Sequence, residues 1–304
     1  MSRAIRSLSL AAALVAAGAA SGCAPAGDRG PTITVTTNIL GDVAAQLAGD
    51  EAEVTVLMKP NADPHSFEIS AQEAARLADS DLLVSNGLGL EENVEQHLET
   101  AAGSGAPRFV AGEHITPLAF SADGATGDDP HFWTDPERMA SVVSALGDTL
   151  AELPGVDAAA IDGNVDAYLD DLEALDDEMT AAFEGIPESN RALVTNHHVF
   201  GYLADRYGFE TVGAVIPSGT TLASPSAADL DSLASAIEST GVPAIFAESS
   251  QPDRLVQVLA DEAGVDVDVV ELFSESLTGP EGPAPTYLDM MRVNSDRIAQ
   301  GLNR

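Results

Sequence analysis

The 304-residue sequence contains a single cysteine, Cys23. A lone thiol cannot form an intramolecular disulfide, and a structural zinc finger is excluded because it needs several cysteines. After the N-terminal leader, no segment approaches the roughly 20 consecutive apolar residues that a membrane-spanning helix requires. With 45% hydrophobic residues, the chain is long enough for one large domain or for two lobes with proper cores.

Basic residues are also scarce. The chain has 13 Lys and Arg against 49 Asp and Glu, a formal net charge of −36, and Lys59 is its only lysine. Removing residues 1–22 takes away Arg3 and Arg6 and no acid, which leaves 11 basic and 49 acidic residues, or −38. Such a surface repels phosphate backbones, so nucleic acid is a poor partner. An acidic, lysine-poor surface is typical of adaptation to high salt, and we expect stability to fall at low ionic strength.

The first 31 residues predict an exported protein. A short basic start and an apolar stretch, Leu8 to Ala20, are typical of a secretory signal peptide over residues 1–22. Small residues then lead into Cys23, as in a bacterial lipobox, although leucine is commoner than Ala20 at that position. We therefore expect a lipidated Cys23 that anchors the protein to the outer face of the cell membrane through a flexible tether, residues 23–31. The alternative is an ordinary signal peptide followed by an incidental cysteine.

From Thr32 onward, β-branched runs alternate with Ala- and Leu-rich helical patterns, which indicates parallel α/β layers. Predicted strands cover residues 32–37, 54–58, 82–85, 192–195, 211–216, 244–247 and 265–270, and predicted helices cover 39–48, 71–78, 136–153 and 288–301. Between about Val156 and Phe183 the pattern stays helical without a strand signal. We therefore predict an α/β fold of two lobes, each a parallel β-sheet flanked by helices, joined by one long connecting helix. The expected bounds are residues 32–153, 154–187 and 188–304.

The tripeptide Asp-Pro-His occurs twice, at residues 63–65 and 129–131, and places His65 and His131 in matched contexts. The chain has only six histidines, so a matched pair favours a shared role over two unrelated structural histidines. Proline fixes its own φ and keeps the preceding residue out of the helical region, so each histidine is expected in a stiff loop. Imidazoles held in this way are ready for a metal ion, and the aromatic pair Phe132 and Trp133 would exclude water from it.

A third cluster, His197 and His198, follows the predicted strand 192–195 at its carboxyl end, where sites in such sheets lie. We expect both histidines at the start of a helix. Neighbouring side chains there point about 100° apart, so only one of the two is expected to join the metal site. His97 is expected on a solvated helix face, and His114 in a loop without the Asp-Pro context, so neither is assigned to the site.

Several motifs in one order carry a resemblance that covers nearly the whole chain from Thr32 onward. They are PNADPHSFE (60–68), DLLVSNG (81–87), DPHFW (129–133), HHVFGY (197–202), FAESS (246–250) and LFSESL (272–277). Together they resemble the metal-binding solute-binding lipoproteins of bacterial zinc and manganese ABC importers. The resemblance implies a protein that is not an enzyme. It captures a divalent metal ion between its lobes and delivers it to a membrane permease coupled to a cytoplasmic ATPase.

Carried over position by position, the family pattern implies metal ligands at His65, His131 and His197. The family's fourth ligand, usually an aspartate, falls on Glu275, whose side chain is one methylene longer. A water molecule in that position is the alternative. Glu248 matches a recurrent family acid near the cleft, and we expect it to play a supporting or structural role. The His-rich loop of many zinc-binding members has no counterpart here.

Three imidazoles and one carboxylate form a borderline-soft, four-coordinate set, which favours zinc over manganese because manganese prefers more oxygen ligands. The same set would fit a catalytic zinc, but the sequence has no His-Glu-x-x-His motif and no Gly-x-Ser-x-Gly elbow. A surface adhesin is a further alternative, as a secondary use of the same fold. We expect a monomer whose metal affinity weakens at acid pH, as the histidines become protonated.

Overall fold

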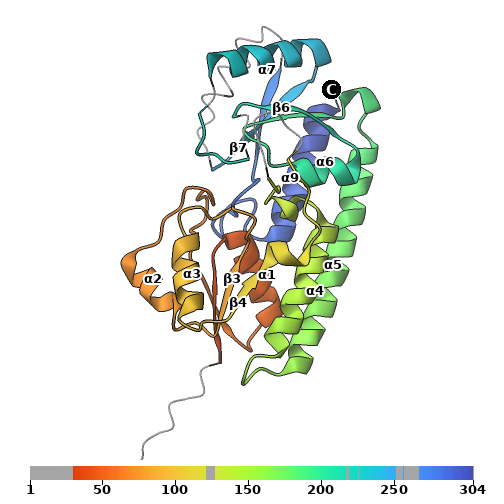
Figure 1. Cartoon of the computed structure of the whole chain (residues 1–304). Helices are drawn as coiled ribbons and strands as arrows, with labels where there is room; N and C mark the ends of the chain where they lie inside the picture. Colours follow the sequence, from red (N-terminus) through yellow and green to blue (C-terminus); the bar gives the residue numbers. More distant parts are fainter. Residues whose placement is uncertain are drawn as a thin grey trace, which may run out of the picture.

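The computed structural model describes residues 30–120, 127–216, 219–224, 226–250, 256 and 267–303. The expected signal peptide (1–22), the expected lipidation site Cys23 and tether residues 23–29 lie outside the described residues. Figure 1 shows two lobes, with the N-terminal lobe below the C-terminal one. In the described part of the chain, no helix has both the length and the apolar character that crossing a bilayer would require.

The N-terminal lobe is built on a parallel sheet with the strand order β2-β1-β3-β4. Its strands are β1 (Thr32–Val35), β2 (Glu53–Val56), β3 (Leu82–Ser85) and β4 (Arg108–Val110). β3 is buried along its whole length, as expected of an interior parallel strand rich in Leu and Val, whereas the edge strand β2 is largely exposed. The helices of this lobe are α1 (Asn38–Ala48), α2 (Ala71–Leu77), α3 (Glu95–Gly103) and α4 (Pro136–Ala151), with the short turns η1 (Ala111–His114) and η2 (Phe132–Thr134).

The C-terminal lobe repeats this arrangement. Its parallel sheet has the order β6-β5-β7-β8, which is the order of the first sheet when each is counted from its own first strand. The strands are β5 (Ala192–Thr195), β6 (Glu210–Ala214), β7 (Ala244–Glu248) and β8 (Asp268–Leu272). The described helices are α6 (Gly201–Tyr207), α7 (Ala227–Thr240) and α9 (Tyr287–Leu302), with the turn η3 (Glu188–Asn190).

A single long helix, α5 (Ala158–Glu184), runs beside both lobes (Figure 1). Asp157 is the N-cap residue of this helix, since its carboxylate accepts a hydrogen bond from the backbone N–H of Ala159. Its buried residues recur at roughly helical spacing and are Ile161, Tyr168, Leu172, Leu175, Met179 and Phe183. This face packs against α1 and α4 on one side and α9 on the other, within one apolar core that extends through both lobes. The connection is therefore a packed helix rather than a flexible linker.

The predicted fold class is confirmed: two parallel α/β lobes are joined by one long helix. Individual ends differ. The strand predicted over 32–37 ends at Val35, because Thr37 instead caps α1 by accepting a hydrogen bond from the N–H of Leu40. The last predicted strand, 265–270, is observed as β8, and residues 265–266 lie outside the described residues. Helix α7 and the three-residue strand β4 were not predicted, whereas α3 is the helix expected to carry His97.

One local prediction is wrong and bears on the site. His197 and His198 lie in a bend before α6, and that helix begins only at Gly201. The bend is held by the Thr195 hydroxyl, which donates to the backbone O of His197 at 2.7 Å. The backbone N–H of Ile216 also donates to the O of Asn196, at 2.7 Å. The backbone is thus engaged in contacts that a helical turn would not allow.

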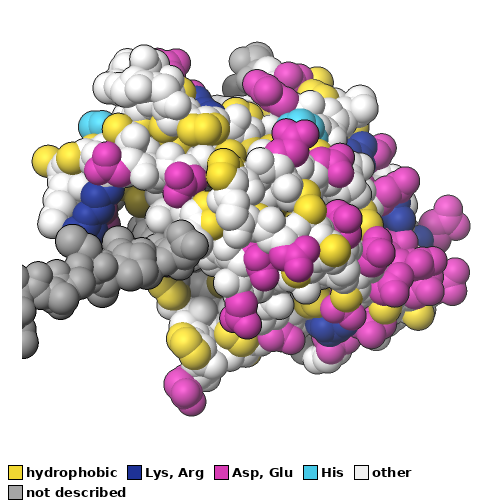
Figure 2. Space-filling view, turned by 90° about the horizontal axis from the view of Figure 1, so that it is seen from below, with side chains coloured by type: hydrophobic (Ala, Val, Ile, Leu, Met, Phe, Trp, Pro, Cys, Tyr) yellow, Lys and Arg dark blue, Asp and Glu magenta, His cyan; other side chains and the backbone are white. Residues whose placement is uncertain are grey.

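Acidic side chains are spread over the face of the molecule seen in Figure 2, and basic side chains occur there in few places. This is the distribution expected from 49 acidic and 13 basic residues in the whole chain. Charges of one sign on a surface repel each other and favour expansion of the chain, an effect that dissolved salt screens.

Candidate metal centre

The four predicted ligand residues all follow strands of the two sheets. His65 lies in a turn after β2, and His131 lies just before η2, after β4. His197 follows β5, and Glu275 follows β8. Because the carboxyl ends of parallel strands share one edge, each sheet delivers two of these residues to the region between the lobes.

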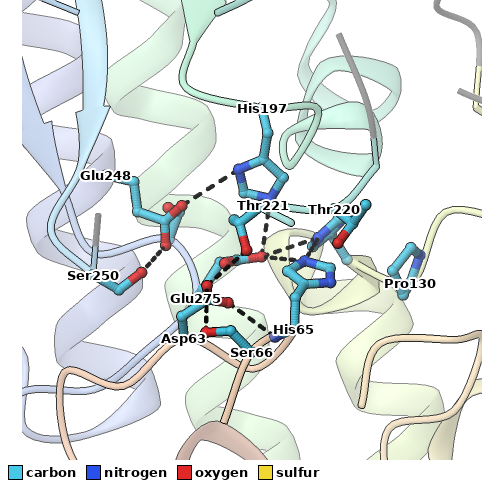
Figure 3. A network of polar contacts seen from close by, with 12 residues as sticks. Asp63, His65, Ser66, Pro130, His197, Thr220, Thr221, Glu248, Ser250 and Glu275 are labelled. Carbon is cyan, nitrogen blue, oxygen red and sulfur yellow. Dashed lines mark hydrogen bonds and ion pairs between the residues drawn. The ribbon is translucent and has the colours of Figure 1, made fainter. Parts of the chain in front are cut away.

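The structure brings these four side chains together around one atom. Oε1 of Glu275 lies 3.0 Å from Nε2 of His65, 3.1 Å from Nε2 of His131 and 3.0 Å from Nε2 of His197. The Nε2 atoms of His65 and His131 are 3.3 Å apart. Figure 3 shows Glu275 between His65 and His197 at the centre of this network. Residues more than 200 positions apart in the sequence are therefore in contact.

The spacing and burial of these atoms fit a small cation. Zn–N bonds of about 2.0–2.1 Å at tetrahedral angles separate neighbouring ligand atoms by about 3.3 Å. The four side chains are at most 1% exposed. Among the described residues, Nδ1 of His65 and Oε2 of Glu275 have no hydrogen-bond partner, although both atoms are buried. Buried polar atoms are normally paired, so these unpaired atoms and the close packing of four ligand-type groups both fit a site for a metal ion.

The two Asp-Pro-His motifs form the same local structure. In each, Oδ1 of the aspartate accepts a hydrogen bond from the backbone N–H of the histidine, at 2.9 Å for the Asp63–His65 pair and 2.9 Å for the Asp129–His131 pair. This contact closes a tight turn in which the intervening proline, lacking an N–H, fits without losing a hydrogen bond. The motif therefore fixes the backbone of the histidine relative to its own loop.

Asp129 orients the imidazole of His131 as well. The Nδ1–H of His131 donates to Oδ1 of Asp129 at 2.7 Å, which leaves Nε2 without a proton in the neutral ring and available to a metal ion. Asp129 is itself held through its backbone O, which accepts from the hydroxyl of Tyr202 at 2.6 Å. The rings of Trp133 and Phe120 lie 5.3 and 6.4 Å from that of His131, centroid to centroid, and cover it from solvent.

The neighbours His197 and His198 have different surroundings. Nδ1 of His197 lies 3.4 Å from Oε2 of Glu248, whose other carboxylate oxygen accepts from the hydroxyl of Ser250 at 2.6 Å. His198 instead lines a separate cavity of about 300 Å³ together with Asp129. Of the two histidines, His197 therefore lies in the cluster, and the bend rather than a helix gives His198 its different surroundings.

The carboxylates of the site raise the pKa of two of its imidazoles, those of His131 and His197. Burial opposes protonation of His131 and His197, but the nearby carboxylates outweigh it. Asp129 and Glu275 raise the pKa of His131, and Glu275 and Glu248 raise the pKa of His197 well above its usual value. Burial likewise opposes ionisation of Glu275, yet the charges of His197 and His65 hold its pKa well below the usual range. The positive charge of the protonated imidazoles thus balances the negative charge of the buried Glu275 carboxylate. A bound divalent ion would take over this role.

Thr221 of the C-terminal lobe contacts the N-terminal lobe next to the cluster. The hydroxyl of Thr221 donates to Oδ2 of Asp63 at 2.6 Å, and the hydroxyl of Ser66 donates to the same oxygen at 2.9 Å (Figure 3). Asp63 therefore supports His65 through one oxygen and contacts the opposite lobe through the other. No sequence pattern indicated Thr221, because it lies far from the Asp-Pro-His motif along the chain and in no motif of its own.

Comparison with known proteins places the chain in a family. The family model described as zinc-uptake complex component A, periplasmic (ZnuA), matches residues 33–301. The chain belongs to this family. Membership covers nearly all of the described residues, and it confirms the family indicated by the ordered motifs.

Relatives within the family carry names for different metals. The zinc-binding protein TroA of Treponema pallidum is 30% identical over 284 residues, which cover 92% of this chain and 91% of that protein. The manganese-binding lipoprotein MntA of Halalkalibacterium halodurans is 28% identical over 295 residues, 96% of each chain. The solved structure of periplasmic TroA covers 90% of this chain and 100% of its own, with a TM-score of 0.84. The two-lobe architecture is therefore that of the family.

Proposed function

We propose that this protein is the extracytoplasmic substrate-binding component of an ABC importer, and that it captures one divalent transition-metal ion between its lobes. The observation that carries the proposal is the convergence of three imidazole nitrogens, from loops of both lobes, on one carboxylate oxygen. Family membership supports the transport role, since several relatives are named substrate-binding lipoproteins of metal ABC transporters. Its relatives are named as binding proteins rather than enzymes, which fits a protein without catalytic activity.

The ligands in this proposal are His65, His131, His197 and Glu275, and the ion is zinc, with manganese as the alternative. Three nitrogen ligands and one carboxylate suit zinc, whereas manganese favours sites richer in oxygen. Oε2 of Glu275 has no hydrogen-bond partner among the described residues, so the carboxylate can bind through one oxygen or through both. Binding through both would raise the coordination number to five and bring the site closer to the preference of manganese.

The ion is cargo, so the site must both bind and release it. Capture would follow from bringing the loops of the two lobes together, and release from moving these loops apart at the permease, whose ATPase drives the cycle. Because α5 is packed within a core shared by both lobes, this movement is expected to be modest and local to the loops. We further propose that a lipid on Cys23 anchors the protein at the outer face of the membrane, and that the protein acts as a monomer. The acidic surface would attract cations towards the protein in general without itself forming a site.

A pair of neighbouring histidines supplies the test. The His197→Ala variant removes a ligand itself. Its zinc affinity should fall by more than roughly 100-fold, which is the upper end of the loss typical when a residue that hydrogen-bonds to a metal ligand is removed. The His198→Ala variant, one residue away, should bind zinc like the unmodified protein. Isothermal titration with zinc and with manganese would measure both variants, and elemental analysis of protein purified from its native host would identify the cargo. Equal zinc affinity in the two variants would contradict the site.

A further inference from the structure

The segment that carries Glu275 passes from one lobe to the other. Up to Phe273 it is part of the C-terminal lobe: the O of Leu272, at the end of β8, accepts from the N–H of Ser249 at 2.9 Å. Asn294 of α9 then pairs with the backbone of Phe273 through both atoms of its amide. Oδ1 accepts from the N–H at 2.9 Å, and Nδ2 donates to the O at 3.0 Å.

After Phe273, the hydrogen bonds of the segment lead to the N-terminal lobe. Nε1 of Trp133 donates to the backbone O of Ser274 at 2.8 Å. Nδ2 of Asn38 donates to the hydroxyl of Ser276 at 2.8 Å, and Oδ1 of Asn38 accepts from the N–H of Leu277 at 2.9 Å. Glu275 thus lies between two anchors, both from the lobe that also carries His65 and His131.

Asn38 connects this segment to the loop of His65. It is the first residue of α1 and is buried, and its Nδ2 also donates to the O of Lys59 at 3.2 Å, at the beginning of that loop. The N–H of Asn61, in the same loop, donates to the O of Leu277 at 3.0 Å. One amide group therefore binds α1, the loop of His65 and the segment of Glu275 together.

His197, in contrast, is held within the C-terminal lobe. The hydroxyl of Thr195 donates to its backbone O at 2.7 Å. The preceding residue, Asn196, accepts from the N–H of Glu248 at 3.0 Å through its side-chain Oδ1. Both partners belong to strands of the second sheet, β5 and β7.

We propose that Asn38 is a positioning residue for metal binding, which holds Glu275 on the N-terminal lobe so that His65, His131 and Glu275 form one body. His197 is then the ligand that the C-terminal lobe brings to the ion and withdraws on release. Although β8 belongs to the second sheet, the fourth ligand moves with the first lobe. This inference rests on the proposed function. It assigns three ligands to the body that contains the N-terminal lobe and one ligand, His197, to the C-terminal lobe.

Two asparagines provide a matched test on the full-length mature chain. Asn38→Ala and Asn294→Ala each remove a buried amide that pairs with the backbone two residues from Glu275, on opposite sides. Cobalt(II) serves as the probe, because it occupies zinc-type sites and its visible absorption depends on its ligands. Asn38→Ala should raise the rate of cobalt release to a chelator by about 10-fold, a typical effect of losing a well-placed hydrogen bond. Its spectrum should move towards that of Glu275→Ala.

The control separates positioning from a general loss of packing. Asn294→Ala should change the release rate by less than about 3-fold, because the anchors on the N-terminal lobe remain. Combined with Glu275→Ala, the Asn38→Ala change should have no further effect on release, since the ligand that it positions is gone. Equal effects of the two asparagine variants, or an undiminished effect in the Glu275→Ala background, would overturn the inference.

Other outcomes are also decisive. If Asn38→Ala does not fold, Trp133→Phe replaces it, because that change removes only the Nε1 donor to Ser274 and keeps most of the ring. It should raise the release rate in the same direction, and only while Glu275 is present; an unchanged rate would overturn the inference. If the unmodified protein does not bind cobalt at all, the proposed function fails and the inference fails with it. Normal binding with an unchanged Asn38→Ala variant refutes the inference alone.

Discussion

Thr221 of the C-terminal lobe and Asp63 of the N-terminal lobe are joined across the cluster by a 2.6 Å hydrogen bond. The same carboxylate fixes the backbone of His65. Asp63 therefore takes part both in the contact between the lobes and in the placement of a ligand. A bond between a hydroxyl and a carboxylate is among the stronger hydrogen bonds, and this one must break when the lobes separate. It is therefore expected to slow the release of metal.

Removing that hydroxyl tests its contribution. Thr221→Val keeps the shape of the side chain and should raise the rate of metal release by about 10-fold, with a much smaller change in the rate of binding. Stopped-flow release of zinc to a fluorescent chelator measures this rate. Thr100→Val, an exposed change in α3, is the control and should release zinc at the unmodified rate. Identical rates for the two variants would remove the role assigned to the contact.

Asp129 is expected to matter through His131. Asp129→Ala removes the acceptor that fixes both the backbone and Nδ1 of this histidine, so zinc affinity should fall by about 10- to 100-fold, as for other outer partners of metal ligands. Competition with a chelator of known affinity measures the loss. Asp128→Ala removes the exposed acid next to it and should leave affinity unchanged. If the two variants bind alike, the orienting role of Asp129 is wrong.

Metal affinity is expected to depend steeply on pH. The pKa values of His131 and His197 are raised in the metal-free protein, so both rings hold protons above the usual pKa of about 6.5, and a metal ion must displace them. As pH falls through these raised values, affinity should fall by about 10-fold per unit for each protonated ring. Glu275, whose pKa is lowered, stays ionised and adds nothing to this slope.

Calorimetric titration in buffers of different ionisation enthalpy would count the protons that zinc displaces. We expect up to two protons near neutral pH, and fewer as the solution becomes alkaline. Affinity that stays constant between about pH 6 and pH 8 would contradict this description of the metal-free site.

Stability is expected to rise with salt. Forty-nine acidic residues face only 13 basic ones, and salt at about 1 M shortens the distance over which charges interact to about 3 Å. The melting temperature in dilute buffer should therefore lie below that in concentrated sodium chloride. Near the sequence pI of about 4.1, where the net charge vanishes, the difference should be small. A melting temperature independent of salt at neutral pH would refute the effect of charge.

The fold and two of the four clustered residues, His65 and His131, could be predicted from the sequence for different physical reasons. At the third position the local pattern left His197 and His198 open, and resemblance to a family favoured His197. Strand and helix periodicity is local, so the two lobes and the long helix α5 followed directly from it. The repeated Asp-Pro-His tripeptide marked His65 and His131 because proline restricts the local backbone. Glu275 has no such local mark, and only resemblance to a family indicated it.

What could not be predicted depends on contacts between distant segments. The bend at His197 is held by Ile216 and Thr195, and no pattern within the bend itself encodes that pairing. Asn38 at the start of a predicted helix reads as an ordinary terminal residue, yet its amide binds a segment more than 230 positions away. The lobe with which a ligand moves is likewise a property of its anchors and not of its position along the chain.

The most direct measurement is anomalous X-ray diffraction, at the zinc absorption edge, from crystals of the mature protein loaded with zinc. We expect one strong peak within bonding distance of Nε2 of His65, His131 and His197 and of the carboxylate of Glu275. A peak elsewhere on the molecule, with these four side chains left in contact only with one another, would contradict this expectation.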